Sequence, residues 1–200
     1  MIQAMATKTP RLSQRERWAL ADLLAELGPD VPTLCEGWRS ADLAAHVVVR
    51  ERRPDSVPGT FLGFAPLVHW TDRARDAVRD TMSWGALLAR LRSGPPALVR
   101  PVDRWFNTLE FFVHHEDLRR AQPGWQPRPL APEDETELWR FAKLATFGRG
   151  HRAARLEAPG LAPLILSKKG GGPVVRGPAG ELVLWLMGRT GAAQVELEAP

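Results

Sequence analysis

The chain of 200 residues has little or none of several residue types, and each scarcity excludes a class of protein. It contains one cysteine, Cys35, which excludes an internal disulfide framework and a multi-cysteine zinc cluster. Any metal ligands are therefore expected to be His, Asp or Glu. The sequence has no run of about 18 apolar residues that could span a membrane, and its N-terminus lacks the apolar segment of a secretory signal. We expect a cytoplasmic protein with no membrane partner.

Lysine occurs four times, asparagine once, isoleucine twice and tyrosine never, whereas Ala, Gly, Pro and Arg are abundant. This bias is typical of a GC-rich genome. The net charge of +4 raises nucleic acid as a partner. The arginines, however, are scattered among acidic residues and form no stripe with stacking aromatic side chains. We therefore expect no nucleic-acid partner.

Hydrophobic periodicity and helix-ending Gly and Pro residues predict helices in the first three quarters of the chain. They are expected at 13–27, 41–52, 71–92 with a kink near 83–85, 107–120 and 133–147. Short β-prone runs follow at 162–167, 174–176 and 193–197, with a glycine turn at 170–172 and one helix at 179–187. The pattern predicts an α+β protein in which an antiparallel helical bundle (1–148) precedes a small α+β domain (149–200).

The most informative stretch is Asn107 to Arg120, with the sequence NTLEFFVHHEDLRR. In a helix, Glu110, His114 and Asp117 lie on one strip because they are spaced i, i+4 and i+7. Apolar side chains flank this strip, so we expect it to face the core. Buried carboxylates and imidazoles need partners or a metal ion, since leaving them unpaired costs on the order of several kcal/mol. The opposite, wetter side is expected to hold His115, Glu116, Arg119 and Arg120.

A third ligand is predicted on the helix at 41–52, where His46 faces the core. Together, His46, Glu110 and His114 offer two imidazoles and one carboxylate, a set that suits Zn²⁺. Three protein ligands leave one coordination position open, as in catalytic zinc sites. Asp117 is then expected to orient His114 or a neighbouring ligand through a hydrogen bond.

Some residues allow other interpretations. Asn107 and Glu110 have the spacing of a capping box, in which the Glu110 side chain bonds a backbone N–H and binds no metal. Cys35 is either a nucleophile or a packing residue, and its place before a Gly–Trp turn favours packing. No His-Glu-x-x-His motif is present, which argues against a metalloprotease.

Two segments, CEGWRSADLAAH (35–46) and NTLEFFVHHEDLRRA (107–121), resemble the metal-binding domain of the mycothiol-dependent maleylpyruvate isomerase family. That family belongs to the DinB-like helical superfamily. The segment GPAGELVLWLMGR (177–189) is similar to the family's small C-terminal domain. The resemblance implies a DinB-like antiparallel four-helix bundle with a zinc ion on His46, Glu110 and His114.

The resemblance also implies a reaction. Family members use a low-molecular-weight thiol, which adds to an activated double bond or is transferred to a small electrophilic substrate. The GC-rich composition fits an actinobacterium, in which the thiol is mycothiol. Arg189 is then a candidate for binding a substrate or cofactor carboxylate, because arginine binds carboxylates with two hydrogen bonds. Its alternative is a surface charge at a helix C-terminus. The alternative function for the whole chain is a non-catalytic metal-binding or regulatory helical protein.

Overall fold

The structure is a computed structural model that describes residues 10–52, 65–97, 103–146, 154–166 and 172–199. These residues form an α+β fold, which confirms the predicted class. The helices are α1 (Leu12–Leu27), α2 (Ser40–Arg52), α4 (Ala65–Thr81), α5 (Trp84–Ser93), α6 (Asp103–Arg120), α7 (Pro132–Ala145) and α8 (Ala179–Leu186). The strands are β1 (Arg155–Glu157), β2 (Leu164–Ile165), β3 (Val174–Arg176) and β4 (Glu196–Glu198).

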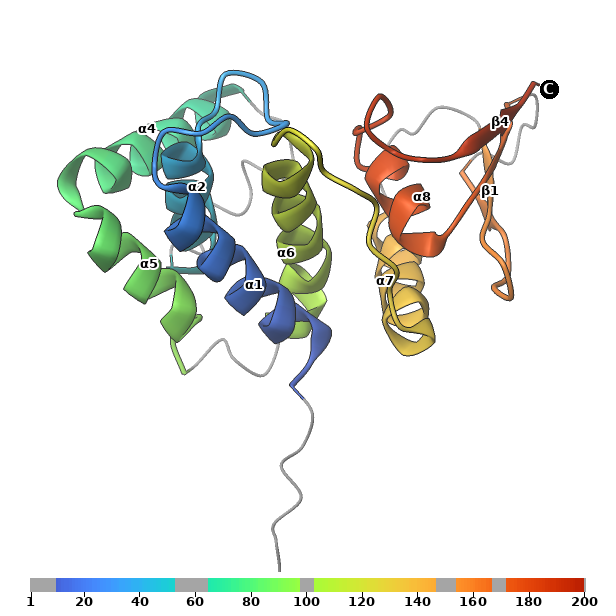
Figure 1. Cartoon of the computed structure of the whole chain (residues 1–200), viewed down its shortest axis with the longest axis horizontal. Coiled ribbons are helices and arrows are strands. Elements are labelled where there is room, and N and C mark those ends of the chain that lie inside the picture. Colours follow the sequence, from blue (N-terminus) through green and yellow to red (C-terminus); the bar gives the residue numbers. More distant parts are fainter. Residues whose placement is uncertain (1–9, 53–64, 98–102, 147–153, 167–171, 200) are drawn as a thin grey trace, which may run out of the picture.

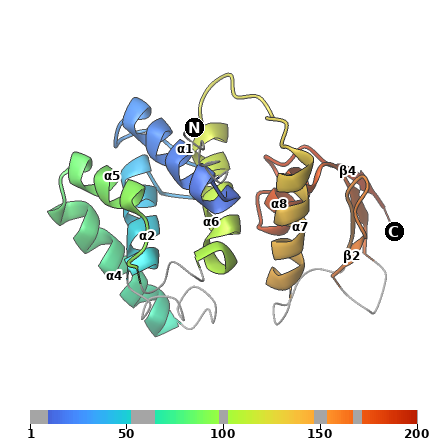
Figure 2. The same ribbon diagram turned by 90° about the horizontal axis from the view of Figure 1, so that it is seen from below.

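The elements gather in two groups (Figures 1 and 2). Helices α1, α2, α4, α5 and α6 form the first group, and α7, α8 and the strands form the second. Helix α6 packs along α1 and lies at the boundary, where it also contacts α7 and α8. The functional residues predicted on α6 are therefore in reach of both groups.

The first group is held together by a hydrophobic cluster between α1, α2, α5 and α6. Phe111 of α6 is fully buried in it, and the guanidinium of Arg17 on α1 lies 4.4 Å from the centre of the Phe111 ring. This cluster fixes the phase of α2 and α6 and hence the direction of their polar residues. Its fully or almost fully buried members are Leu20, Ala21, Leu24, Leu43, Ala44, Ala45, Val47, Val48, Leu87, Leu88, Leu91, Phe111 and Leu118.

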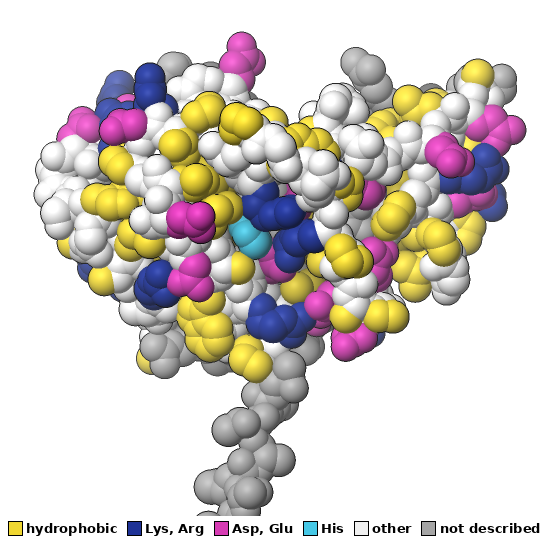
Figure 3. Space-filling model, in the orientation of Figure 1, with side chains coloured by type: hydrophobic (Ala, Val, Ile, Leu, Met, Phe, Trp, Pro, Cys, Tyr) yellow, Lys and Arg dark blue, Asp and Glu magenta, His cyan; other side chains and the backbone are white. Residues whose placement is uncertain are grey.

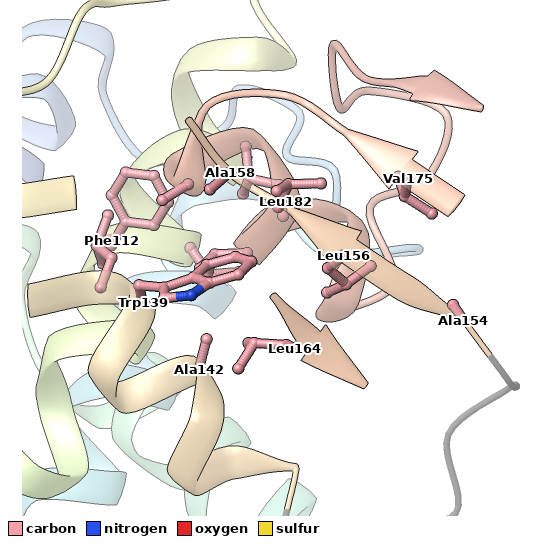
Figure 4. Packing of buried hydrophobic residues seen from close by; sticks show 14 of the residues in the cluster. Phe112, Trp139, Ala142, Ala154, Leu156, Ala158, Leu164, Val175 and Leu182 are labelled. Atoms are coloured by element: carbon pink, nitrogen blue, oxygen red, sulfur yellow. The ribbon is translucent and has the colours of Figure 1, made fainter. Parts of the chain in front are cut away.

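A second hydrophobic cluster joins α7, α8 and the sheet, and Figure 4 shows Trp139 of α7 at its centre. The indole N–H of Trp139 donates a hydrogen bond to the Ala162 carbonyl at 2.8 Å. Helix α7, which falls within the predicted helical domain 1–148, thus packs its buried face in the same cluster as the strands. Phe112 brings α6 into contact with this cluster.

Gly180 lets α8 approach α6 closely. A Cβ atom at this position would lie 2.9 Å from Leu130 Cδ1 and 3.1 Å from Phe112 Cζ, both closer than ordinary contact. The N-terminus of α8 is further fixed by Glu135 of α7, whose carboxylate accepts a hydrogen bond from the Ala179 amide at 2.5 Å. These contacts hold the segment after α8 next to α6.

The sheet has the strand order β2-β1-β3-β4. Strand β1 pairs antiparallel with β2 and parallel with β3, and β3 pairs antiparallel with β4. The strand predicted at 174–176 is confirmed, β2 lies inside the run 162–167, and β4 is shifted from 193–197 to 196–198. Strand β1 was not predicted, because its single buried residue, Leu156, lies between charged residues. The turn predicted at 170–172 falls largely outside the described residues.

Two helix boundaries differ from the prediction. The helix expected at 71–92 consists of α4 and α5, and the Ser83 side chain caps α5 by accepting a hydrogen bond from the Ala86 amide. Helix α6 begins at Asp103, four residues before Asn107. Asn107 is therefore inside the helix and does not cap it, so the capping-box interpretation is wrong. Among the described residues, no helix is long and apolar enough to cross a membrane.

Candidate metal centre

A pocket of about 820 Å³ opens where the two groups of elements meet. Figure 3 shows a histidine surface near the middle of the molecule, next to Lys or Arg side chains. Three regions of the sequence form the walls of the pocket. They are the loop before α2 (Leu34, Cys35, Glu36, Trp38), the facing sides of α2 and α6 (His46, Glu110, Val113, His114) and the segment after α8 (Met187, Gly188, Arg189, Gly191, Ala192).

His46, Glu110 and His114 converge in this pocket, as the sequence predicts. One potential ligand atom from each residue lies within 4.8 Å of the other two. The Nε2 atom of His114 is 3.5 Å from Oε2 of Glu110. The rings of His46 and His114 meet edge to face, with their centres 5.1 Å apart. We call these three residues the candidate centre.

The candidate centre fits a divalent metal ion by its donor chemistry. Zinc binds imidazole nitrogen and carboxylate oxygen at about 2.0–2.2 Å, which places tetrahedral ligand atoms about 3.4 Å apart. The separation of 3.5 Å between His114 and Glu110 is close to this value. All three side chains line the pocket, so a bound ion would keep a side open to a further ligand. The three residues are thus a suitable set of ligands for zinc.

Asp117 holds the His114 ring in one orientation. The Nδ1 atom of His114 donates a hydrogen bond to Oδ2 of Asp117 at 3.0 Å, which directs Nε2 towards Glu110. Asp117 itself is fully buried. A carboxylate behind a ligating histidine fixes the tautomer and makes the ring a stronger donor. The structure therefore contains the hydrogen bond between Asp117 and His114 that the sequence predicts.

Arg189, from the segment after α8, binds Asp117 with two hydrogen bonds. Its Nε atom lies 2.8 Å from Oδ1 and its Nη2 atom 2.6 Å from Oδ2. The arginine is not a free surface charge, because it lines the pocket and reaches across to α6. The carboxylate that Arg189 holds in this structure is Asp117, and this contact ties the C-terminal segment to the candidate centre.

Cys35 lies in the same pocket. Its thiol donates a hydrogen bond to Oδ2 of Asp117 at 3.3 Å, and Nη2 of Arg189 lies 3.6 Å from the sulfur. Cys35, His114 and Asp117 form a second set of possible ligands. That set requires Nδ1 of His114 and the carboxylate of Asp117, which are bonded to each other and to Arg189. A metal ion at the candidate centre would leave the hydrogen bonds of Asp117 intact, so we favour the candidate centre as the metal site.

Burial and neighbouring charge shift the pKa values of the two histidines in opposite directions. Burial, together with the charge of His114, lowers the pKa of His46 to about 3, so that its ring is neutral at pH 7 and able to bind a metal. Burial also disfavours the charged form of His114, but hydrogen bonds with Asp117, Cys35 and Glu110 raise its pKa well above 6.5. Metal binding would therefore displace a proton from His114.

Both carboxylates are held in the ionised form. Burial acts to raise the pKa of Glu110, but the charge of Arg50 and the hydrogen bond with His114 lower it far below its ordinary value. Burial opposes ionisation of Asp117 in the same way, and hydrogen bonds with His114 and Arg189 lower its pKa to about 2. Glu110 is therefore ionised near pH 7 and can act as an anionic ligand.

Arg50 is a contact of Glu110 that sequence reasoning missed. Its Nη2 atom lies 3.2 Å from Oε1 of Glu110, and its side chain is buried. Its Nη1 atom donates a hydrogen bond to Oδ1 of Asn107 at 2.7 Å. A signal was present, because Arg50 follows His46 by four residues and therefore shares its helix face.

The prediction that His115, Glu116 and Arg120 face solvent is wrong. Their exposed fractions are 7%, 1% and 6%. His115 donates a hydrogen bond from Nδ1 to Glu16 of α1 at 2.8 Å, and Arg120 binds Glu181 of α8 with two hydrogen bonds at 2.6 and 2.9 Å. These side chains face α1, the segment before α7 and α8, which the helical pattern of α6 alone does not show.

Arg128, from the segment between α6 and α7, completes this second cluster. It binds both oxygens of Glu16 at 2.6 and 2.9 Å and Oε1 of Glu116 at 2.7 Å. Glu116 also accepts a hydrogen bond from Arg120 at 2.7 Å. We call this cluster the interface network; it comprises Glu16, His115, Glu116, Arg120, Arg128 and Glu181.

No family model, curated protein or solved structure matches the chain. The function is therefore inferred from the geometry of the candidate centre and from the motifs of the chain itself.

Proposed function

We propose that the protein binds a divalent metal ion, zinc in the first place, through His46, Glu110 and His114. The observation that carries this proposal is the convergence of three ligand-type side chains from two helices in one open pocket. A structural zinc site is normally closed by four protein ligands, whereas three ligands beside an open pocket are typical of a catalytic site. The proposal therefore extends to an enzyme.

We further propose that this enzyme is a thiol-dependent transferase or isomerase, with mycothiol as the cosubstrate and a small electrophile as the substrate. When bound, zinc supplies a Lewis acid that lowers the pKa of a coordinated thiol. The volume of about 820 Å³ lies within the range of about 300–1,000 Å³ that is usual for small-molecule and cofactor sites. The motif resemblance of residues 35–46, 107–121 and 177–189 supports the same assignment, and with it a DinB-like arrangement of the bundle.

The protein's own residues have separate parts in this proposal. His46 and His114 supply neutral nitrogen ligands and Glu110 supplies one negative charge. Asp117 keeps His114 in the tautomer that leaves Nε2 free for the metal. Arg189 lines the pocket with its guanidinium bonded to Asp117, and in this proposal it also binds an anionic group on the thiol or the electrophile.

Metal analysis tests whether the protein binds zinc through the candidate centre. Protein purified without chelator is expected to contain close to one equivalent of zinc, and His114→Ala is expected to contain none. A wild-type protein that binds no divalent metal, even after incubation with zinc, would remove the centre. Lys143→Ala, on α7 and outside the pocket, serves as the control for loss of zinc that is not specific to the ligands.

An assay of thiol consumption tests whether the protein is a thiol-dependent enzyme. The zinc-loaded protein is assayed with mycothiol and a panel of electrophiles, including activated alkenes that can isomerise. Consumption or isomerisation that requires both zinc and the thiol supports an enzyme. Zinc binding without turnover across the panel supports instead the alternative, a non-catalytic metal-binding protein.

A further inference from the structure

Glu110, a member of the candidate centre, forms an ion pair with the buried side chain of Arg50. The two oxygens of Glu110 have different partners, since Oε1 is 3.2 Å from Nη2 of Arg50 and Oε2 is 3.5 Å from Nε2 of His114. A free carboxylate can offer a metal ion either one oxygen or both. In this structure one of the two oxygens is already bound to a cation.

The Arg50 guanidinium is held in place by a chain of polar contacts across three helices. Oδ1 of Asn107 on α6 accepts a hydrogen bond from Nη1 of Arg50 at 2.7 Å. The Asn107 amide donates to Oε1 of Glu51 on α2 at 3.1 Å. Glu51 in turn is paired with Arg17 of α1. All these side chains are buried, so the guanidinium has little freedom to release Glu110.

Burial of such a chain is costly unless every member is well paired, and apolar residues could fill the same space without that cost. This series of polar contacts begins at Arg17 on α1, which is not among the residues that line the pocket, and ends at Glu110. Its last contact is the one that concerns the candidate centre, because Arg50 and His46 share a face of α2 and both approach Glu110.

We propose that Arg50 is a positioning residue that holds Oε1 of Glu110, so that Glu110 presents only Oε2 to the metal ion. This inference rests on the proposed function and makes it more specific. A carboxylate limited to one oxygen occupies one coordination position, which leaves the remaining position to a ligand in the pocket. Arg50 would thus keep the metal ion accessible without touching the metal or the substrate.

The test uses the full-length protein with Co²⁺ in place of Zn²⁺, because the intensity of the visible Co²⁺ absorption reports the coordination number. The wild type is expected to give the intense bands of a four-coordinate ion. Arg50→Met, which fills a similar volume without charge, is expected to free Oε1 and weaken these bands several-fold. Arg50→Lys keeps the positive charge and is expected to retain most of the wild-type intensity.

Arg17→Met is the matched control. Arg17 is a buried arginine in the same polar chain that pairs with Glu51 and lies over the Phe111 ring, so its removal should reduce stability and leave the Co²⁺ bands unchanged. If Arg50→Met does not fold, Arg50→Gln replaces it, since glutamine can stay bonded to Asn107 without binding Glu110 as a cation. The same loss of intensity is expected.

The outcomes separate this inference from the proposed function. A wild type that binds neither Co²⁺ nor Zn²⁺ overturns both. Stoichiometric Co²⁺ binding with the same intense bands in the wild type, Arg50→Met and Arg50→Gln overturns the role of Arg50 alone. Weaker bands in Arg17→Met as well as in the Arg50 variants would also overturn it, because the effect would then come from general loosening of the bundle.

Discussion

Helix α6 carries two buried polar clusters on different faces, and they differ in one respect. In the interface network, every carboxylate is bonded to arginine or histidine, and the side chains connect α1, α6, α8 and the segment before α7. The candidate centre differs in composition, because its carboxylate, Glu110, lies beside two imidazole rings in a pocket of about 820 Å³, whereas members of the interface network line a separate, smaller pocket of about 460 Å³. Clustered imidazole and carboxylate donors suit a metal ion, whereas carboxylates paired with arginines across elements contribute to stability.

The largest expected effect separates the two neighbouring histidines. His114→Ala removes one of three ligands. Loss of a residue that only supports a ligand lowers metal affinity about 10–100-fold, and His114→Ala is expected to lower zinc affinity by more than this. His115→Ala is expected to keep wild-type zinc affinity, because its partner is Glu16. Competition with a chromogenic chelator measures both. Equal loss of zinc in the two variants would contradict the division of α6 into two clusters.

The next effect concerns the interface network and stability. Arg120→Met leaves Glu181 without its two-bond partner, and breaking a buried ion pair in this way costs about 3–5 kcal/mol. Urea unfolding monitored by tryptophan fluorescence measures the change. Arg119→Met is the control, since Arg119 also binds Glu116 but is more exposed, and the expected loss is about 1 kcal/mol or less. Equal losses of unfolding free energy in the two variants would contradict a stabilising role of the interface network.

A smaller effect is expected behind the candidate centre. Asp117→Asn weakens the hydrogen bond that orients His114 and is expected to reduce zinc affinity by about 10–100-fold. The control is Glu116→Gln, one residue earlier on α6 and directed to the interface network, which is expected to change stability but not zinc affinity. If Asp117→Asn binds zinc as tightly as the wild type, Asp117 does not support the centre.

The smallest effect is a pH dependence in the interface network. Burial acts to raise the pKa of Glu16, but hydrogen bonds with His115 and Arg128 lower it below its ordinary value of 4.5. A carboxyl whose pKa is lower in the folded protein stabilises the fold above the unfolded pKa, and this contribution is lost as the pH falls through the folded value. The stability difference between wild type and Glu16→Gln should therefore be largest near pH 7 and shrink below pH 4.5.

Urea midpoints of wild type and Glu16→Gln at several pH values between 3 and 7 measure this dependence. A difference that stays constant over the range would show that the Glu16 carboxyl does not titrate with a lowered pKa. The same comparison for Asp22→Asn, an exposed acid on α1, provides the baseline.

The helical phase of Glu110, His114 and His46 could be predicted from the sequence because it depends on local spacing. Once α2 and α6 form and bury Leu43, Val47 and Phe111, their polar strips have to meet. The α+β class followed similarly, from the change of pattern after residue 148. These features need no knowledge of contacts between distant segments.

The interface network could not be predicted in this way. The partner of His115 is 99 residues away in the sequence, and the partner of Arg120 is 61 residues away. A helical pattern assigns charged residues to the solvent side by default, and only the packing of α1 and α8 against α6 shows that this side is covered. Helix α6 begins at Asp103, so Asn107 does not cap it, although Asn107 and Glu110 have the spacing of a capping box.

The pocket walls come from three segments that lie far apart in the chain: the loop before α2 together with α2 itself, the middle of α6 and the turn after α8. A molecule bound there is in contact with both groups of elements at once. By mass action, a ligand at 100 times its dissociation constant adds about 2.7 kcal/mol to the free energy of unfolding. A ligand that contacts all three segments is released when either group unfolds, so we expect occupancy to couple the unfolding of the two groups.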